Sequence, residues 1–125
     1  MVAKILVLDD EESWLELVRG KLSGLGHEVG TATDCTDALV QISDDRPDLV
    51  IIDLRMPVSG STMLLALRED WPELPVVVHT VYSGYRHDPN LRGVAGFAVK
   101  NPELTELVGV VDGVLSKGHA EASPG

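Results

Sequence analysis

The sequence predicts an α/β protein with a doubly wound, five-stranded parallel sheet. Strand-like and helix-like segments alternate along the 125 residues, which is the pattern of parallel strands joined by crossover helices. Two short apolar runs, residues 5–8 and 49–52, have the length and composition of buried strands. Each run ends abruptly in aspartate, at Asp9 and at Asp53. The same observations therefore predict the fold class and a polar site at one edge of the sheet.

The first predicted strand, residues 4–8, leads into a helix over residues 11–25. Apolar side chains recur in this helix at helical spacing, and Gly24 and Gly26 mark its end. The predicted buried stripe consists of Trp14, Leu17, Val18, Leu22 and Leu25.

A weaker strand over residues 28–33 comes next, followed by a helix that Asp34 can cap. This helix is predicted to bury Ala38, Leu39 and Ile42. Pro47 closes the segment, and residues 48–53 form the predicted central strand.

A loop containing Met56, Pro57 and Gly60 precedes a helix over residues 61–70, which is predicted to bury Met63, Leu64 and Leu67. The valine-rich residues 75–80 form the fourth strand. Residues 81–93 contain Gly84, Gly93 and the turn sequence Asp-Pro-Asn at 88–90, so any helix there is predicted to be short or distorted.

The fifth strand is predicted over residues 94–100. Asn101 is predicted to cap the last helix, with Pro102 at its first position. Its expected buried stripe consists of Leu104, Leu107, Val108, Val111 and Leu115. The domain is expected to span residues 1–117, with residues 118–125 forming a disordered tail or linker stub.

Right-handed crossovers favour the flavodoxin-like strand order 2-1-3-4-5, with helices on both faces of the sheet. In that order the first and third strands are neighbours, so Asp9, Asp10 and Asp53 meet at one sheet edge. Clustered carboxylates repel one another and favour a bound divalent cation. Because oxygen ligands with room for water suit Mg²⁺, the sequence predicts a magnesium site there.

Composition narrows the function classes. The formal net charge is -10, from twenty acidic and ten basic residues, which argues against direct binding to nucleic acid or to an anionic membrane. The single cysteine, Cys35, favours a reducing compartment, and we expect a cytoplasmic protein without a signal peptide. The four histidines show no metal-ligand spacing, and His79 is expected to be a hydrogen-bonded strand histidine.

Four motifs together resemble the receiver domain of bacterial response regulators, the phosphoacceptor domain of two-component signalling. The resemblance covers about residues 2–117. The motifs are Leu8-Asp9-Asp10-Glu11, Ile52-Asp53-Leu54-Arg55-Met56-Pro57, Thr80 at the end of a valine strand, and Phe97-Ala98-Val99-Lys100. Each motif alone is weak, but all four occur in order at the ends of alternate strands.

The resemblance implies a role for each matching residue at the acidic site. Asp53 is implied as the phosphoacceptor nucleophile. Asp10 is implied as a direct Mg²⁺ ligand, Asp9 as a ligand through water, and the backbone carbonyl of Arg55 as a further ligand. Lys100 is implied to form an ion pair with the phosphoryl group, which Mg²⁺ and this ammonium would neutralise.

Other matching residues are implied to carry the switch. Thr80 corresponds to the hydroxyl residue that turns toward the phosphoryl group, and Phe97 to the aromatic switch residue. Val81 and Tyr82 occupy positions that influence access to the site in the family. Val81 is bulkier than the small residue common there, and Phe97 lacks the hydroxyl of the commoner tyrosine.

Three further departures from the family pattern concern spacing. Asn101 intervenes between Lys100 and Pro102, where proline usually follows the lysine directly, so the aim of Lys100 is open. The loop from Asp53 to Gly60 is one residue shorter than usual, and the segment from Thr80 to Phe97 is also short.

The leading functional hypothesis is a module that accepts phosphate from a histidine kinase or a histidine phosphotransfer protein and then presents an altered face to an output protein or output domain. Such a module is not an enzyme beyond assisting its own phosphorylation and dephosphorylation, and is expected as a monomer or weak homodimer. One alternative is a pseudo-receiver acting as a constitutive interaction module. Another is a haloacid-dehalogenase-like magnesium phosphatase, although the Asp-x-Asp pattern of that class is missing.

Overall fold

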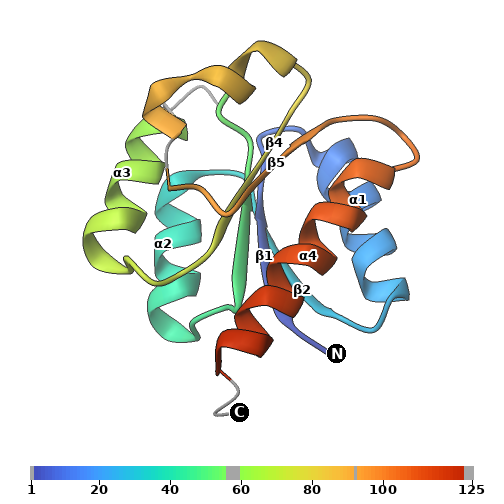
Figure 1. The fold of residues 1–125 in the computed structure, drawn as a ribbon, viewed down its shortest axis with the longest axis horizontal. Helices are drawn as coiled ribbons and strands as arrows, with labels where there is room; N and C mark the ends of the chain where they lie inside the picture. Colours follow the sequence, from blue (N-terminus) through green and yellow to red (C-terminus); the bar gives the residue numbers. More distant parts are fainter. Residues whose placement is uncertain (1, 56–59, 92, 123–125) are drawn as a thin grey trace.

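The computed structural model describes residues 2–55, 60–91 and 93–122. It confirms the predicted α/β fold, with one parallel sheet in the order β2-β1-β3-β4-β5 (Figure 1). The strands are β1 (Lys4–Leu8), β2 (Glu28–Ala32), β3 (Leu49–Ile52), β4 (Val76–Thr80) and β5 (Gly96–Val99). The α-helices of the described residues are α1 (Glu12–Gly24), α2 (Cys35–Asp44), α3 (Gly60–Asp70) and α4 (Thr105–Ala122).

Helices α1 and α4 cover one face of the sheet, and α2 and α3 cover the other (Figure 1). Each face has its own apolar core because successive side chains of a strand point to opposite faces. Along β3, Val50 and Ile52 join the core under α2 and α3, whereas Leu49 and Ile51 join the core under α1 and α4. The central strand β3 is consequently apolar and buried throughout, as expected for a strand covered on both sides.

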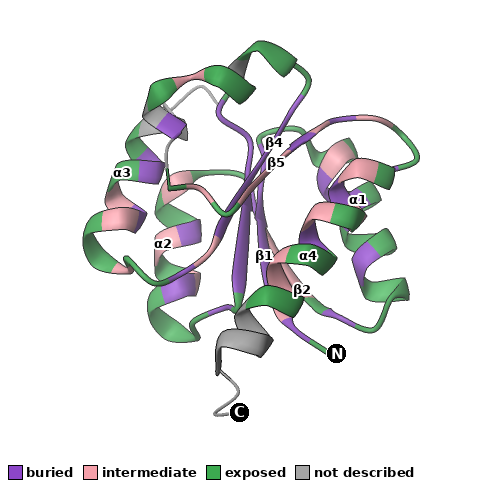
Figure 2. Ribbon diagram, viewed as in Figure 1, coloured by how far each residue is buried: buried purple, intermediate pink, exposed green. Residues whose placement is uncertain are grey.

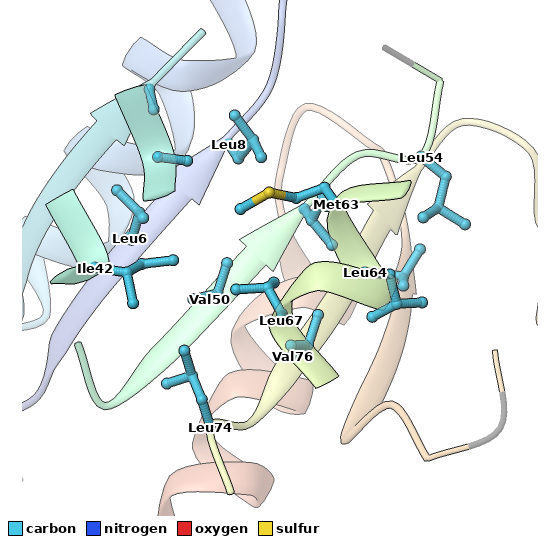
Figure 3. Packing of buried hydrophobic residues seen from close by; sticks show 14 of the residues in the cluster. Leu6, Leu8, Ile42, Val50, Leu54, Met63, Leu64, Leu67, Leu74 and Val76 are labelled. Carbon is cyan, nitrogen blue, oxygen red and sulfur yellow. The ribbon is translucent and has the colours of Figure 1, made fainter. Parts of the chain in front are cut away.

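The core under α2 and α3 is drawn in Figure 3, where Leu6, Val50 and Val76 from three neighbouring strands lie beneath Ile42 and Leu67. Figure 2 shows buried residues concentrated in the central strands, with exposed residues on the outer helix surfaces. This packing holds the strand ends, and therefore the residues that follow them, in fixed relative positions.

Strand register brings the two aspartate-bearing ends together. β1 and β3 pair in parallel with Leu8 opposite Ile52, so Asp9 and Asp53 leave the sheet at the same level. The Asp53 amide donates a hydrogen bond to the Leu8 carbonyl at 3.1 Å. The predicted adjacency of the first and third strands is thereby confirmed.

The segment after β4 is irregular, as predicted. It forms two 3₁₀ helices, η1 (Ser83–His87) and η2 (Pro89–Leu91), in place of an α-helix. The prediction that Asp34 caps the second helix is also confirmed, because its carboxylate accepts from the Asp37 amide at 2.8 Å. The predicted turn at Met56 and Pro57 lies outside the described residues.

The predicted start of the last helix is wrong. Helix α4 begins at Thr105, and Asn101 instead closes a turn by accepting the Leu104 amide at its side chain (2.8 Å) and at its carbonyl (3.0 Å). Leu104 adopts a positive φ of 57°, which separates this turn from the helix. α4 then continues to Ala122, beyond residue 117, while the proposed domain boundary at residue 117 stays a prediction.

The predicted buried stripe of the first helix is partly wrong. Leu15, Val18 and Leu22 are buried, whereas Leu17 is 41 % exposed and Leu25 is 48 % exposed. The stripe at positions 15, 18 and 22 satisfies helical spacing as well, and it is the one that faces β1 and the rest of the core. Within the described residues, no helix combines the length and apolarity needed to cross a bilayer.

Candidate functional site

Asp9, Asp10 and Asp53 assemble at the carboxyl edge of the sheet. One carboxylate oxygen from each lies within 4.8 Å of the others. Asp9 and Asp53 are buried, and Asp10 is exposed, so the cluster has a dry side and a side open to solvent. Three carboxylates around a partly wet position form a donor set that suits a hard divalent cation such as Mg²⁺.

Local turns orient the two buried carboxylates. Oδ1 of Asp9 accepts a hydrogen bond from the Glu11 amide at 3.0 Å, and Oδ1 of Asp53 accepts one from the Arg55 amide at 2.9 Å. These bonds fix each side chain against the backbone two residues further on, as aspartate commonly does at the end of a strand. The second oxygen of each carboxylate is thereby left to contact other groups.

Lys100 contacts both of these second oxygens. Its ammonium lies 2.6 Å from Oδ2 of Asp9 and 2.8 Å from Oδ2 of Asp53, and its side chain is only 1 % exposed. The Lys100 amide donates to the Thr80 carbonyl at 2.7 Å, which continues the β4–β5 pairing beyond Val99. The insertion of Asn101 therefore leaves Lys100 directed at the acidic cluster, which answers the question that the sequence left open.

Burial and pairing with opposite charges shift the pKa values of Asp9 and Lys100 in opposite directions. Burial raises the pKa of Asp9, although the hydrogen bonds from Lys100 and from the Glu11 amide work against that rise. Burial alone would lower the pKa of Lys100, but its hydrogen bonds to Asp53 and Asp9 outweigh it, so the pKa is raised. Lys100 therefore stays protonated and acts as a fixed positive charge.

Thr80 lies at the end of β4 and is fully buried. Its hydroxyl oxygen lies 3.5 Å from the Tyr82 amide, the long limit of a hydrogen bond, so this contact is weak. Val81 and Tyr82, the predicted access residues, are 52 % and 57 % exposed. Control of access by these two side chains stays a prediction.

Phe97 lies on β5 and packs, partly buried, against the core under α2 and α3. The Arg86 guanidinium of η1 lies 4.8 Å from the centroid of its ring. Arg86 also forms an ion pair with Glu106 at the start of α4, and this hydrogen bond is the main cause of the lowered pKa of Glu106. Arg86 therefore links η1 to both β5 and α4, a connection that the sequence did not predict.

Two aromatic residues beside the cluster were also missed. The Trp14 ring centroid lies 5.0 Å from the Lys100 ammonium, and the His79 ring meets the Trp14 ring edge-on at 5.8 Å and 88°. The expectation of a hydrogen-bonded His79 is wrong, because its buried Nε2 has no hydrogen-bond partner among the described residues. The available signal was the position of Trp14 in the first turn of α1, close after Asp10.

Comparison with known proteins places this arrangement among signalling proteins. The family model described as the response regulator receiver domain matches residues 5–112. The transcriptional regulatory protein PrrA of Mycobacterium tuberculosis is 34% identical over 125 residues, covering 96% of this chain and 53% of PrrA. The response regulator PleD of Caulobacter vibrioides is 38% identical over 87 residues, covering 67% of this chain and 19% of PleD. The chain thus spans about half the length of PrrA.

Solved structures agree with the sequence matches. The response regulator TrrA of Thermotoga maritima, in complex with Mg²⁺-BeF, superposes with a TM-score of 0.83 at 32% identity, covering 89% of this chain and 97% of TrrA. TrrA in complex with the histidine kinase ThkA superposes with a TM-score of 0.82 at 33% identity, covering 90% of this chain and 97% of that chain. The chemotaxis response regulator CheY4 of Vibrio cholerae superposes with a TM-score of 0.81 at 30% identity, covering 91% of this chain and 99% of CheY4.

Proposed function

Because this chain belongs to the receiver-domain family of response regulators, we propose that it is a phosphorylatable signalling module with Asp53 as its phosphoacceptor. The observation that carries the proposal is the contact of Lys100 with Asp53 at 2.8 Å, beside two further carboxylates. In this proposal Asp53 is the nucleophile, Lys100 is a fixed positive charge and the three aspartates are cation ligands, all at the carboxyl end of the sheet. Each is a component that phosphoryl transfer to a carboxylate needs.

Asp9, Asp10 and Asp53 fit a magnesium ion by their chemistry and spacing, and the Arg55 carbonyl is proposed as a further ligand. When bound, Mg²⁺ supplies positive charge that neutralises phosphoryl oxygens. The Mg²⁺-BeF complex of TrrA, a relative that this chain covers almost completely, supports this assignment.

The chain's own residues account for the transfer. An Asp53 oxygen attacks the phosphorus of the donor, so that an oxygen–phosphorus bond forms while the donor's bond to phosphorus breaks and its electron pair leaves with the donor. Lys100, already protonated and desolvated, stabilises the negative charge on the transferred group. The Arg55 amide holds Oδ1 of Asp53, which limits rotation of the carboxylate during attack.

We assign the response to phosphorylation to Thr80 and Phe97. Among the described residues, the Thr80 hydroxyl has one weak hydrogen bond, from the Tyr82 amide, whereas a phosphoryl oxygen would offer a strong one. A contact that exists in one state alone is what shifts a conformational equilibrium. Phe97 then moves by packing, because it has no hydroxyl to anchor an outward position.

A histidine kinase or a histidine phosphotransfer protein is the proposed donor, and the complex of TrrA with the kinase ThkA supports this choice. An output protein or an attached output domain is the proposed recipient of the signal, since PrrA is about twice as long as the matched region. We propose a cytoplasmic module, monomeric or weakly dimeric, that is regulatory rather than enzymatic and makes no direct contact with nucleic acid or membrane.

Intact-mass measurement after incubation with acetyl phosphate and Mg²⁺ tests the proposal. The wild type should gain one phosphoryl group, and Asp53→Asn should gain none. Asp48→Asn, at an aspartate remote from the cluster at the opposite end of β3, is the matched control and should be modified like the wild type. Equal modification of wild type and Asp53→Asn would refute the assignment, and lack of modification in both would favour the pseudo-receiver.

A further inference from the structure

Trp14 lies against the most buried cation of the site, and we propose that it is a positioning residue that holds the Lys100 ammonium at Asp53. The inference rests on the proposed function, since it concerns how Lys100 assists transfer to Asp53. Trp14 lies outside the four motifs that carry the family resemblance. The residue is instead singled out by its contacts with Lys100 and His79.

The geometry suits a cation–π contact. The Lys100 ammonium lies 5.0 Å from the centroid of the Trp14 ring, inside the range of about 6 Å over which an indole face attracts a cation. Indole is the strongest of the aromatic faces in this respect, and the attraction grows when the cation is desolvated. The Lys100 side chain is 1 % exposed, so water screens this contact poorly.

An aromatic face performs a task here that a further carboxylate could not. The ammonium has three N–H donors, and Asp9 and Asp53 each accept from it. A third anion would compete with Asp53 for the ammonium, whereas a neutral ring attracts it without competing as a hydrogen-bond acceptor. The contact with Trp14 therefore remains available whether Lys100 pairs with a carboxylate or with a phosphoryl oxygen.

His79 keeps the Trp14 ring in place. Its ring meets the indole edge-on at 5.8 Å, and its side chain is almost completely buried on β4. Burial and the positive charge of Lys100 lower the pKa of His79 to about 4, while Asp53 and Glu106 oppose that shift. The imidazole is therefore neutral at physiological pH and adds no repulsion to the ammonium. A neutral, immobile support behind Trp14 leaves the indole little freedom to turn away from Lys100.

The rate of Asp53 phosphorylation by acetyl phosphate in saturating Mg²⁺ tests the role. Trp14→Leu, which keeps an apolar side chain but no ring, should slow phosphorylation on the order of tenfold. Trp14→Phe should restore most of the rate, because phenyl retains a weaker cation–π face. Trp71→Leu is the matched control: it removes a tryptophan that packs against the other core, and should leave the rate within about twofold of the wild type.

A double-mutant cycle separates positioning from simple loss of packing. If Trp14 acts through Lys100, Trp14→Leu should have no further effect in a Lys100→Ala background. Equal fold-losses in both backgrounds would overturn the proposal. So would a Trp14→Leu protein that is phosphorylated as fast as the wild type.

A second readout does not depend on phosphorylation. In the wild type the Lys100 ε-methylene protons should show an upfield ring-current shift by NMR, which Trp14→Leu should abolish and Trp71→Leu should preserve. An unshifted wild-type signal would refute the contact. Failure of the wild type to accept phosphate at all would instead refute the proposed function, while the NMR result would still decide whether Trp14 holds Lys100.

Discussion

The buried His79 should make this protein acid-sensitive in a way that a single substitution removes. Its side chain is 2 % exposed, Nε2 has no hydrogen-bond partner within the described residues, and burial together with Lys100 lowers its pKa from 6.5 to about 4. Between pH 6.5 and about pH 4, His79 is therefore mostly protonated in the unfolded chain and mostly neutral in the folded protein. Since the unfolded state then binds more protons, the stability contributed by neutral His79 is complete above pH 6.5 and is lost as the pH falls toward 4.

The size of the effect follows from the two pKa values. Between pH 7.5 and pH 4.5, the shift from 6.5 to about 4 removes roughly 2.5 kcal/mol from the free energy of unfolding. That is a large fraction of the 5–15 kcal/mol typical of a domain, so it is measurable. Asp9 works in the opposite direction, because burial raises its pKa and its protonation favours folding on acidification.

Urea unfolding of the wild type and of His79→Leu, at both pH values in chelator, isolates the His79 contribution. The Asp9 effect is common to both proteins and cancels in the difference. The wild type should lose about 2.5 kcal/mol more than His79→Leu on acidification. His87→Gln, at an exposed histidine, should follow the wild type. Parallel loss of stability in the wild type and His79→Leu would show that His79 can be protonated in the folded state, and would refute the reasoning.

Three other substitutions test the site and the packing. Asp10→Ala should abolish Mg²⁺ binding by calorimetry and leave the metal-free melting temperature equal or higher, because it relieves carboxylate repulsion; unchanged Mg²⁺ affinity would contradict the ligand role. Val81→Ala should speed phosphorylation by acetyl phosphate if its side chain limits access, and an unchanged rate would exclude it as a gate. Gly96→Ala should destabilise by about 1–3 kcal/mol in urea unfolding, because its Cβ would overlap a Val110 methyl group. Gly109→Ala is the control: it meets nothing within 4 Å and should be neutral or stabilising, and equal effects of the two changes would contradict the packing argument.

The sheet could be predicted from sequence because its strands carry redundant signals. Residues 49–52 are entirely apolar, and Asp53 marks their end. A strand that is buried on both faces accepts few polar side chains, so its continuous apolar composition identifies it. Chirality and adjacency rules then leave few strand orders, and the observed order is the expected one. The assembly of the three aspartates follows directly from that order.

The start of the last helix could not be predicted in the same way. Asn101 and Pro102 carry a typical helix-start signal, but asparagine closes turns by the same side-chain hydrogen bond that it uses to cap helices. The deciding feature is Leu104, whose side chain is 2 % exposed while its backbone has a positive φ. Insertion of that side chain into the core requires the separate turn, and this is a tertiary effect that no local pattern contains.

The contacts around Lys100 could not be predicted from the sequence for a related reason. Trp14 and His79 are distant from Lys100 in sequence, and each had a plain alternative as a packing residue. Only the three-dimensional packing of α1, β4 and the end of β5 shows that Trp14 contacts the Lys100 ammonium and that His79 in turn contacts Trp14. The motif residues were predictable because they occur at strand ends, whereas their supports come from neighbouring elements.

Backbone pairing also suggests how events at Asp53 could reach Phe97. The Lys100 amide donates to the Thr80 carbonyl, and Phe97 is paired with Val78 on the same two strands. A movement of Thr80 toward a phosphorylated Asp53 would therefore pull on β5 as well as on the segment that follows β4. That segment is held by Arg86, which contacts the Phe97 ring and pairs with Glu106 at the surface. Because an exposed ion pair contributes only about 0–1 kcal/mol, the Arg86–Glu106 part of this restraint is weak compared with a charge-assisted contact to a phosphoryl group.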